Sequence, residues 1–158
     1  MTDYGAGTGA GIYARESGYL DRYVQLGIAQ GRVISVDFPT QTEPNAESDH
    51  ELLDRIEAYL TGTREEFADV QVAMTMPTDQ REVLEAVRTV PYGEQASVEQ
   101  LARMAPSRNP DDEEDARRIR EALAANPAPI LIPTHRIRDG PGGAPPDAET
   151  KLRAVEGL

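Results

Sequence analysis

NPAPILIPTHRI, residues 126–137, is the stretch of sequence that decides the fold and the function. Its first two residues end the helix before them, because proline has no N–H with which to continue it. The apolar run at residues 130–132 then predicts a short buried strand. A hydroxyl and an imidazole, Thr134 and His135, follow that strand. On their own, a histidine and an arginine in a loop are typical of a solvated surface.

Helices precede this stretch. We expect Thr78 to cap a helix that runs to Arg88, and residues 91–93 (PYG) to form a turn. Ser97 and Gln100 have the spacing of a capping box, which opens a short helix to Met104.

The acidic residues 111–115 precede a helix that runs through Ala125, and their charge suits the positive end of its dipole. Its expected buried stripe is Ile119, Ala122 and Leu123. Two helices joined by a turn and followed by a strand are compatible with a helix-turn-helix or winged-helix module. By periodicity alone, a purely structural helical pair fits equally well.

The first half of the chain predicts a small α/β domain over residues 19–75, with Pro77 at the boundary to a second domain over 77–158. Apolar and polar residues alternate over residues 23–29 and 32–38, on either side of a Gln-Gly pair, which predicts a hairpin. Apolar residues at helical spacing predict a helix over 47–60, and 70–75 predicts a short strand; the apolar positions of that helix are Leu52, Leu53, Ile56 and Leu60.

Residues 1–18 predict a flexible tail. They contain GAGTGAG, which loosely satisfies a dinucleotide-binding fingerprint at Gly5, Gly7 and Ala10. That fingerprint needs a preceding strand, and the sequence offers none.

The composition limits the chemistry. There is no cysteine and there are two histidines, which excludes disulfides and thiolate catalysis and predicts neither a metal site nor a cofactor. No apolar run reaches the roughly 18 to 20 residues that span a bilayer, and no signal segment opens the chain. We therefore expect a soluble cytoplasmic protein. We also expect a monomer, although the sequence does not determine the oligomeric state.

The charge balance indicates a salt-rich environment. Acidic residues number 28 against 16 basic ones, for a net charge of −12, and Lys151 is the one lysine. This is typical of a halophilic cytoplasm, although an acidic domain from an arginine-preferring genome fits too. Such a charge opposes nucleic acid at low salt, but at 1 M salt the Debye length is roughly 3 Å and the repulsion is screened. Counterion release also contributes little there, so DNA binding would depend on shape and local contacts.

Three segments together resemble the signature of the O6-alkylguanine-DNA alkyltransferases, the methylated-DNA-protein cysteine methyltransferases. They are VPYGE (90–94), SVEQLA (97–102) and NPAPILIPTHRI (126–137), and the similarity tapers to Glu156. The resemblance implies a ribonuclease H-like α/β domain followed by a mainly α winged-helix domain. That second domain would enter the minor groove of double-stranded DNA and flip the damaged guanine out of the stack.

The resemblance also implies which residues contact DNA. Residues 97–104 become the first helix of the DNA-binding unit and 116–125 its recognition helix. Arg117 takes the place of the arginine that fills the gap left by the flipped base, although a solvated arginine face is the alternative. The implied DNA-contact residues are Ser97, Arg117, Arg118 and Arg120.

At the active site, the resemblance makes His135 the residue that activates the acceptor through water, and Glu156 the residue that orients that histidine. Asn126 matches the asparagine that braces the active-site turn, which is compatible with a simple helix C-cap. The implied structural residues of the site are Tyr92, Asn126, Pro133 and Arg136.

Thr134 stands where the family has its acceptor cysteine. A thiol titrates near pH 8.5 and can be shifted down to a thiolate, whereas an alcohol is far too weakly acidic. Displacement at an alkyl carbon offers no oxyanion intermediate that would help a hydroxyl. In this respect the chain is similar to alkyltransferase-like proteins, which bind the lesion and recruit repair proteins without removing it, although they usually carry tryptophan at this position.

Other positions depart from the family. Arg120 and Glu121 replace small residues on the groove-facing helix, and Val98 replaces the tyrosine that pushes the target phosphate. Residues 111–115 are an acidic insertion, and 140–146 replaces the glycine-rich substrate loop.

Three functions therefore remain open. The first is a non-catalytic DNA-binding protein linked to repair of O6-alkylguanine. The second is a methyltransferase or hydrolase that uses Thr134 with His135 and Glu156. The third is an interaction module that kept the fold and lost DNA.

Overall fold

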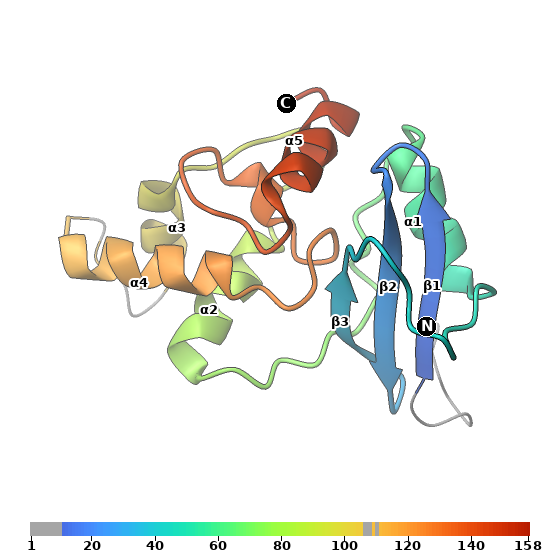
Figure 1. Cartoon of the computed structure of the whole chain (residues 1–158). Coiled ribbons are helices and arrows are strands. Elements are labelled where there is room, and N and C mark those ends of the chain that lie inside the picture. Colours follow the sequence, from blue (N-terminus) through green and yellow to red (C-terminus); the bar gives the residue numbers. More distant parts are fainter. Residues whose placement is uncertain (1–10, 106–108, 110) are drawn as a thin grey trace.

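A three-stranded antiparallel sheet with one helix lies beside a group of helices in the computed structural model, which describes residues 11–105, 109 and 111–158 (Figure 1). Gln30 and Gly31 turn the chain between strands β2 (Arg22–Ala29) and β3 (Arg32–Asp37). Both have positive φ, 55° and 77°, as a two-residue hairpin turn requires. The predicted hairpin is confirmed.

Strand β1 (Gly11–Ser17) pairs with β2 along its whole length, from Gly11 opposite Ile28 to Ser17 opposite Arg22. The predicted flexible tail is therefore wrong for residues 11–17, and residues 1–10, with most of the glycine fingerprint, lie outside the described residues. Only Ala14 of β1 is buried. An edge strand held mainly by backbone hydrogen bonds leaves little hydrophobic pattern to detect.

Helix α1 (Glu51–Leu60) packs against β1 (Figure 1). It begins later than the predicted residue 47, because the ring of His50 accepts a hydrogen bond from the N–H of Leu52 at 3.0 Å and caps it. The predicted apolar stripe is buried, together with Tyr59. The strand predicted over residues 70–75 is wrong, since only an isolated parallel bridge joins Val72 to Val33 there.

The helical half contains α2 (Thr78–Val87), α3 (Val98–Met104) and α4 (Glu113–Ala124), which pack on one another. Then follow the short 3-10 turn η1 (Thr134–Arg136) and helix α5 (Pro146–Val155), which pack together.

Two predictions in this half are confirmed and two are wrong. Both hydrogen bonds of the Ser97–Gln100 capping box are present, and the stripe of α4 is buried. Thr78 does not cap α2, which begins after Pro77 without a side-chain cap. Residues 130–132 form a tight turn and not a strand, because the side chain of Asn126 binds the N–H of Ala128 and the C=O of Ile132.

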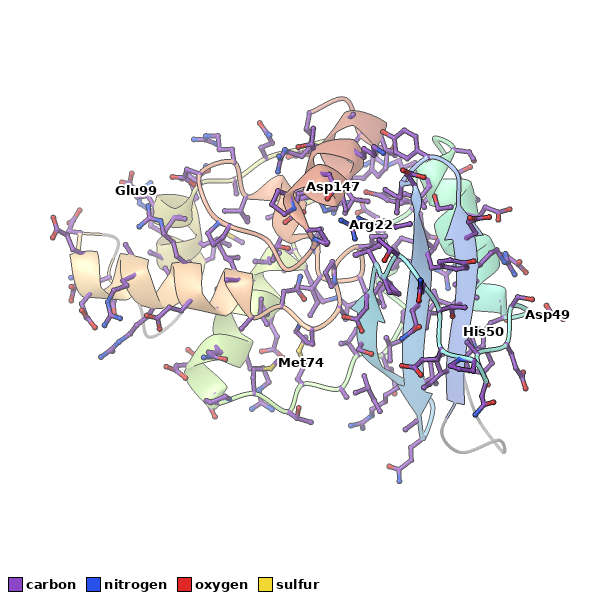
Figure 2. The ribbon with its side chains drawn as sticks, viewed as in Figure 1. Arg22, Asp49, His50, Met74, Glu99 and Asp147 are labelled. Carbon is purple, nitrogen blue, oxygen red and sulfur yellow. The ribbon has the colours of Figure 1, made fainter. Side chains whose placement is uncertain are left out.

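The two halves share one hydrophobic core, and polar contacts fasten them together at the edge of it. The N–H of Val36 donates to the C=O of Pro127 at 2.9 Å. The guanidinium of Arg22, on β2, binds both carboxylate oxygens of Asp147, on α5, at 3.0 and 3.1 Å (Figure 2). Within the described residues no helix is long and apolar enough to cross a membrane.

The capping box generates a prediction. Ser97→Ala removes the acceptor for the N–H of Gln100 at the start of α3 and should lower the free energy of unfolding by about 1 kcal/mol. Ser97→Thr keeps a capping oxygen and should lose clearly less. Urea unfolding of the three proteins measures this, and equal stability of wild type and Ser97→Ala would contradict it.

Candidate functional site

The turn that carries Thr134 is enclosed by the protein. The N–H of Thr134 donates to the C=O of Ile132 at 2.8 Å, and Pro133 between them has φ −81° and ψ 67°, the geometry of an inverse γ-turn. Thr134 and His135 are each 1% exposed and Arg136 is 3% exposed. Consecutive polar residues buried in this way must find their partners inside the protein.

The Thr134 hydroxyl is held from two sides. Its oxygen accepts hydrogen bonds from Nδ2 of Asn126 at 3.1 Å and from the N–H of Gly143 at 3.2 Å. A hydroxyl has two acceptor lone pairs, so both are engaged and only the proton remains to be offered. Asn126 thus braces the turn that carries Thr134.

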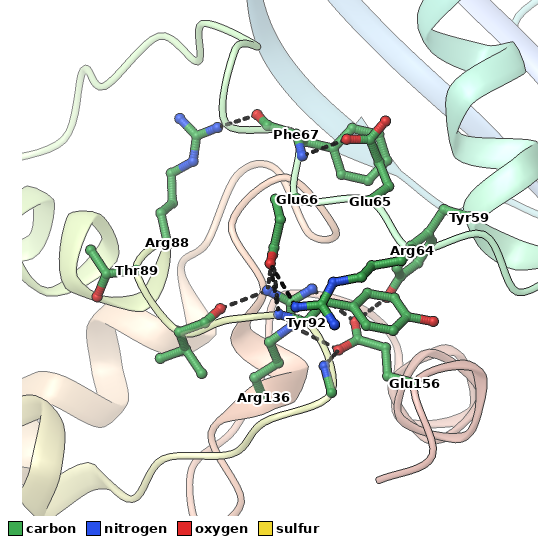
Figure 3. A network of polar contacts seen from close by, with 12 residues as sticks. Tyr59, Arg64, Glu65, Glu66, Phe67, Arg88, Thr89, Tyr92, Arg136 and Glu156 are labelled. Carbon is green, nitrogen blue, oxygen red and sulfur yellow. Dashed lines mark hydrogen bonds and ion pairs between the residues drawn. The ribbon is translucent and has the colours of Figure 1, made fainter.

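Glu156 is the acceptor on which the cluster converges (Figure 3). Its Oε1 accepts from Nε of Arg136 at 2.8 Å and from the N–H of Gly93 at 2.9 Å. Its Oε2 accepts from Arg136 at 3.1 Å, from His135 at 2.6 Å and from the hydroxyl of Tyr59. Burial acts to raise the pKa of Glu156, but hydrogen bonds from His135 and Arg136 outweigh it and lower the pKa to about 2. Glu156 is therefore a carboxylate.

The carboxylate fixes the tautomer of His135. Since Oε2 of Glu156 can only accept, Nε2 of His135 must carry the ring proton. Burial lowers the pKa of His135, against the opposing effect of Glu156, so the ring is neutral. Nδ1 is then an unprotonated acceptor. It is buried without a hydrogen-bond partner among the described residues, on the residue next to Thr134.

Tyr59 is a member of this cluster that the sequence analysis missed. It comes from α1, in the other half of the chain, and its hydroxyl oxygen lies 3.1 Å from Nε2 of His135 as well as bonding Glu156. Burial and the charge of Glu156 raise the pKa of Tyr59 well above its usual value, so the hydroxyl keeps its proton. A tyrosine inside the apolar stripe of α1 was the available signal, because a buried tyrosine hydroxyl needs a polar partner.

Arg136 and Tyr92 close the cluster on its other side. Arg136 also donates to the C=O of Val90 at 2.7 Å, and its guanidinium lies 5.8 Å from the centre of the Tyr92 ring. The N–H of Tyr92 binds the carboxylate of Glu66 (Figure 3).

The residues that the resemblance assigns to DNA lie elsewhere, on α3 and α4. Arg117 is exposed and forms ion pairs with Glu114 and, at 2.6 Å, with Glu121. Arg118 lies 3.6 Å from Glu114, and Arg120 is exposed with no ion pair to a described residue. The hydroxyl of Ser97 is engaged in the cap of α3. The predicted site residues thus form a buried cluster around Glu156 and an exposed group of arginines on α4, while Ser97 is buried at the start of α3.

No group of three or more potential metal ligands occurs within the described residues. The cluster is instead built for hydrogen bonding around a fixed carboxylate.

The carboxylate generates a prediction with a pH signature. Its pKa of about 2 lies below the ordinary 4.5, so it stabilises the fold above pH 4.5 and that stabilisation, about 3 kcal/mol, is lost as the pH falls towards 2. Glu156→Gln should destabilise the protein at pH 7 by about 3 kcal/mol, because the buried Arg136 loses the carboxylate that binds its Nε and keeps only Glu66, 3.5 Å away, as a counter-ion. The variant should also lack this acid-dependent loss. Denaturant unfolding at several pH values measures both, and an unchanged acid slope in Glu156→Gln would contradict the assignment.

Comparisons with known proteins agree with this architecture. Residues 78–155 match the family model described as "6-O-methylguanine DNA methyltransferase, DNA binding domain". The methylated-DNA–protein-cysteine methyltransferase of Methanopyrus kandleri is 33% identical over 129 residues, which are 78% of this chain and 93% of that protein. The enzyme of the same name from Metallosphaera sedula is 27% identical over 107 residues, 66% of this chain and 64% of that protein.

Solved structures show the same fold. The O6-methylguanine methyltransferase of Mycobacterium tuberculosis superposes with a TM-score of 0.72 at 22% identity, over 93% of this chain and 92% of that one. The structure of the same organism's protein in complex with DNA gives 0.69 at 22%, over 93% and 91%. The O6-methylguanine-DNA methyltransferase of Pyrococcus kodakaraensis gives 0.65 at 19%, over 94% and 99%. The chain belongs to the O6-alkylguanine-DNA alkyltransferase family, and it does so without a cysteine.

Proposed function

We propose that this chain is a non-catalytic, alkyltransferase-like DNA-binding protein that serves DNA repair by recognising O6-alkylguanine in double-stranded DNA. The observation that carries the proposal is Thr134, at the acceptor position of a site whose other polar groups are in place.

The chemistry of Thr134 argues against alkyl transfer. Displacement at an alkyl carbon requires a strong nucleophile, which the family obtains as a thiolate and an alcohol does not supply at neutral pH. Here the hydroxyl oxygen is further weakened as a nucleophile, because the hydrogen bonds from Asn126 and Gly143 occupy its lone pairs. The Thr134 hydroxyl can therefore form hydrogen bonds with a base but does not attack its alkyl carbon.

The same site supports recognition of a base. His135, the residue after Thr134, carries a buried acceptor nitrogen without a partner among the described residues, and Glu156 holds its tautomer. Unpaired buried polar groups are costly in a folded protein and are typical of ligand sites. A relative of this fold was solved in complex with DNA, and by similarity we extend DNA binding to this chain, with α4 entering the minor groove.

The ion pairs of Arg117 bear on how α4 would engage DNA. Arg117 must leave Glu114 and Glu121 before it can fill the gap of a flipped base. Exposed pairs of this kind are worth about 0 to 1 kcal/mol and are screened by salt, so their release costs little. We further propose that α3 and α4 act as a winged-helix unit and that the N-terminal half is ribonuclease H-like. We also propose that the protein is a monomer and works in a salt-rich cytoplasm.

One observation favours a second function. His135, the residue after Thr134, carries an unprotonated imidazole nitrogen, and a base of this kind activates serine and threonine in acyl transfer when it comes within hydrogen-bond reach of the hydroxyl. A methyltransferase or hydrolase that uses Thr134, His135 and Glu156 is therefore the alternative. Incubation with methylated duplex followed by intact-protein mass analysis decides it, because an unshifted mass with an intact lesion excludes methyl transfer to the protein and dealkylation.

DNA binding is the first prediction of the proposal. The protein should bind a duplex with one O6-methylguanine more tightly than the matched plain duplex, and the preference should persist in molar salt. Arg117→Ala should weaken binding to the lesion about tenfold, or roughly 1.4 kcal/mol. Fluorescence anisotropy titrations across a series of salt concentrations measure these affinities.

Arg32→Ala is the matched control, since Arg32 is an exposed arginine on the sheet; it should leave binding unchanged. Equal affinity for both duplexes would remove lesion recognition from the proposal. Absence of binding at every salt concentration would favour an interaction module that has lost DNA.

Restoring the acceptor is the second prediction. Thr134→Cys places a thiol on the residue before His135, in a chain that has no other cysteine. We expect this variant to gain the mass of one methyl group in place of a hydrogen when incubated with the methylated duplex, whereas Thr134→Ser gains nothing. Transfer to the wild-type threonine would overturn the proposal, and no transfer to a folded, DNA-binding Thr134→Cys would show that more than the nucleophile has changed.

A further inference from the structure

Residues 140–145, which we call the strap, connect the turn after η1 to helix α5. The glycines of the strap lie in close contact with the site and with α4. The N–H of Gly143 donates to the hydroxyl oxygen of Thr134, and a Cβ at Gly143 would lie 2.6 Å from the C=O of Asn126. At Gly140 an added Cβ would lie 2.6 Å from Cδ1 of Leu123, on α4. The strap therefore covers the acceptor position.

Glu149, on α5, lies directly beneath this strap. A Cβ at Gly142 would overlap the carboxyl group of Glu149, so only glycine lets the strap approach so closely. Glu149 is 6% exposed, and its Oε2 is one of two buried side-chain atoms without a hydrogen-bond partner in the described part of the chain. The other is Nδ1 of His135, at the site that the strap covers.

Among the residues that the structure describes, none forms an ion pair with the Glu149 carboxyl. Most charged and titratable groups on the elements packed against α5 are engaged elsewhere, whereas Glu51 of α1 and Lys151 of α5 itself form no ion pair with a described residue. Four of the engaged groups bind Glu156 or Asp147: His135 and Arg136 of η1, Tyr59 of α1 and Arg22 of β2. Four more bind other partners on or near α1: Arg15, Asp54, Arg55 and Glu57. Arg153, one turn further along α5, is the charge that acts on Glu149. Burial raises the pKa of Glu149 to about 7 in spite of Arg153.

We propose that Glu149 is the latch of the strap: its protonated carboxyl stays beneath Gly142 and keeps the strap closed over Thr134, and its ionisation releases the strap and opens the acceptor position. The carboxyl can lie unpaired in the interior only while it is neutral, because an isolated charge there is strongly disfavoured. Once ionised, it gains by moving into solvent, and the strap that rests on it moves as well.

The sign of the pH effect follows from the two protonation equilibria. The closed state holds the proton with a pKa of about 7, and the open state with the ordinary value of 4.5. Opening is thus at its minimum below pH 4.5, rises up to about tenfold per pH unit between 4.5 and 7, and is constant above that, for a total of up to about 300-fold.

Amide hydrogen exchange of Gly143 tests the latch without DNA, because that N–H bonds Thr134 only while the strap is closed. We expect its protection factor, corrected for the intrinsic exchange rate, to fall with rising pH between 5 and 7 in the wild type. It should be independent of pH in both Glu149→Gln and Glu149→Leu, whose side chains stay neutral. Glu113→Gln, the same change at an exposed acid, should keep the wild-type fall. A pH-independent protection factor in the wild type, or the same fall in Glu149→Gln, would overturn the latch.

The role of the latch in admitting a base rests on the proposed function, and a separate experiment addresses it. The preference for a duplex with O6-methylguanine should rise from pH 5.5 to 7.5 in the wild type and stay constant in Glu149→Gln. A protein that binds no duplex would refute the proposed function while the exchange result still decides the latch. If the preference is independent of pH in both proteins, the claim that the latch admits a base is refuted. The proposed function and the latch itself are not.

Discussion

The buried carboxylate of Glu156 is the interaction on which the rest of the site depends. It receives donors from the N-terminal half (Tyr59), from the turn before α3 (Gly93) and from η1 (His135 and Arg136). A charge this deeply enclosed is tolerated only when its oxygens are fully bonded, so each donor must be held in place. The packing of α1, η1 and α5 and the tautomer of His135 are thereby parts of one arrangement.

The site has the polar groups that surround the acceptor position, but it lacks the acceptor sulfur. The histidine with its free nitrogen, the glutamate that orients it and the asparagine that braces the turn are all present around residue 134. A hydroxyl at that position keeps the shape and the hydrogen bonds of the turn but removes the sulfur that alkyl displacement needs. Under the proposed function, such a site holds a damaged base and does not repair it.

Residue patterns predicted the elements whose signals are local. The hairpin followed from a Gln-Gly pair between alternating strands, the start of α3 from a capping box, and the buried face of α4 from its periodicity. Strand β1 was missed because its pairing is with the backbone of β2, and residues 130–132 were misassigned because the side chain of Asn126 replaces the partners of a strand. A tyrosine in the apolar stripe of α1 indicated a buried hydroxyl, but its partners His135 and Glu156 are distant in sequence and could not be named from it. The burial of Glu149 beneath Gly142 depends on the path of residues 140–145, which no pattern in the sequence indicated.

A crystal structure of the protein with a duplex that contains one O6-methylguanine would test the central claim most directly. The account predicts that the damaged base is extruded from the stack and lies beside Thr134 and His135, with its methyl group still on O6. A base that remains stacked in the duplex, or a methyl group on the oxygen of Thr134, would contradict it.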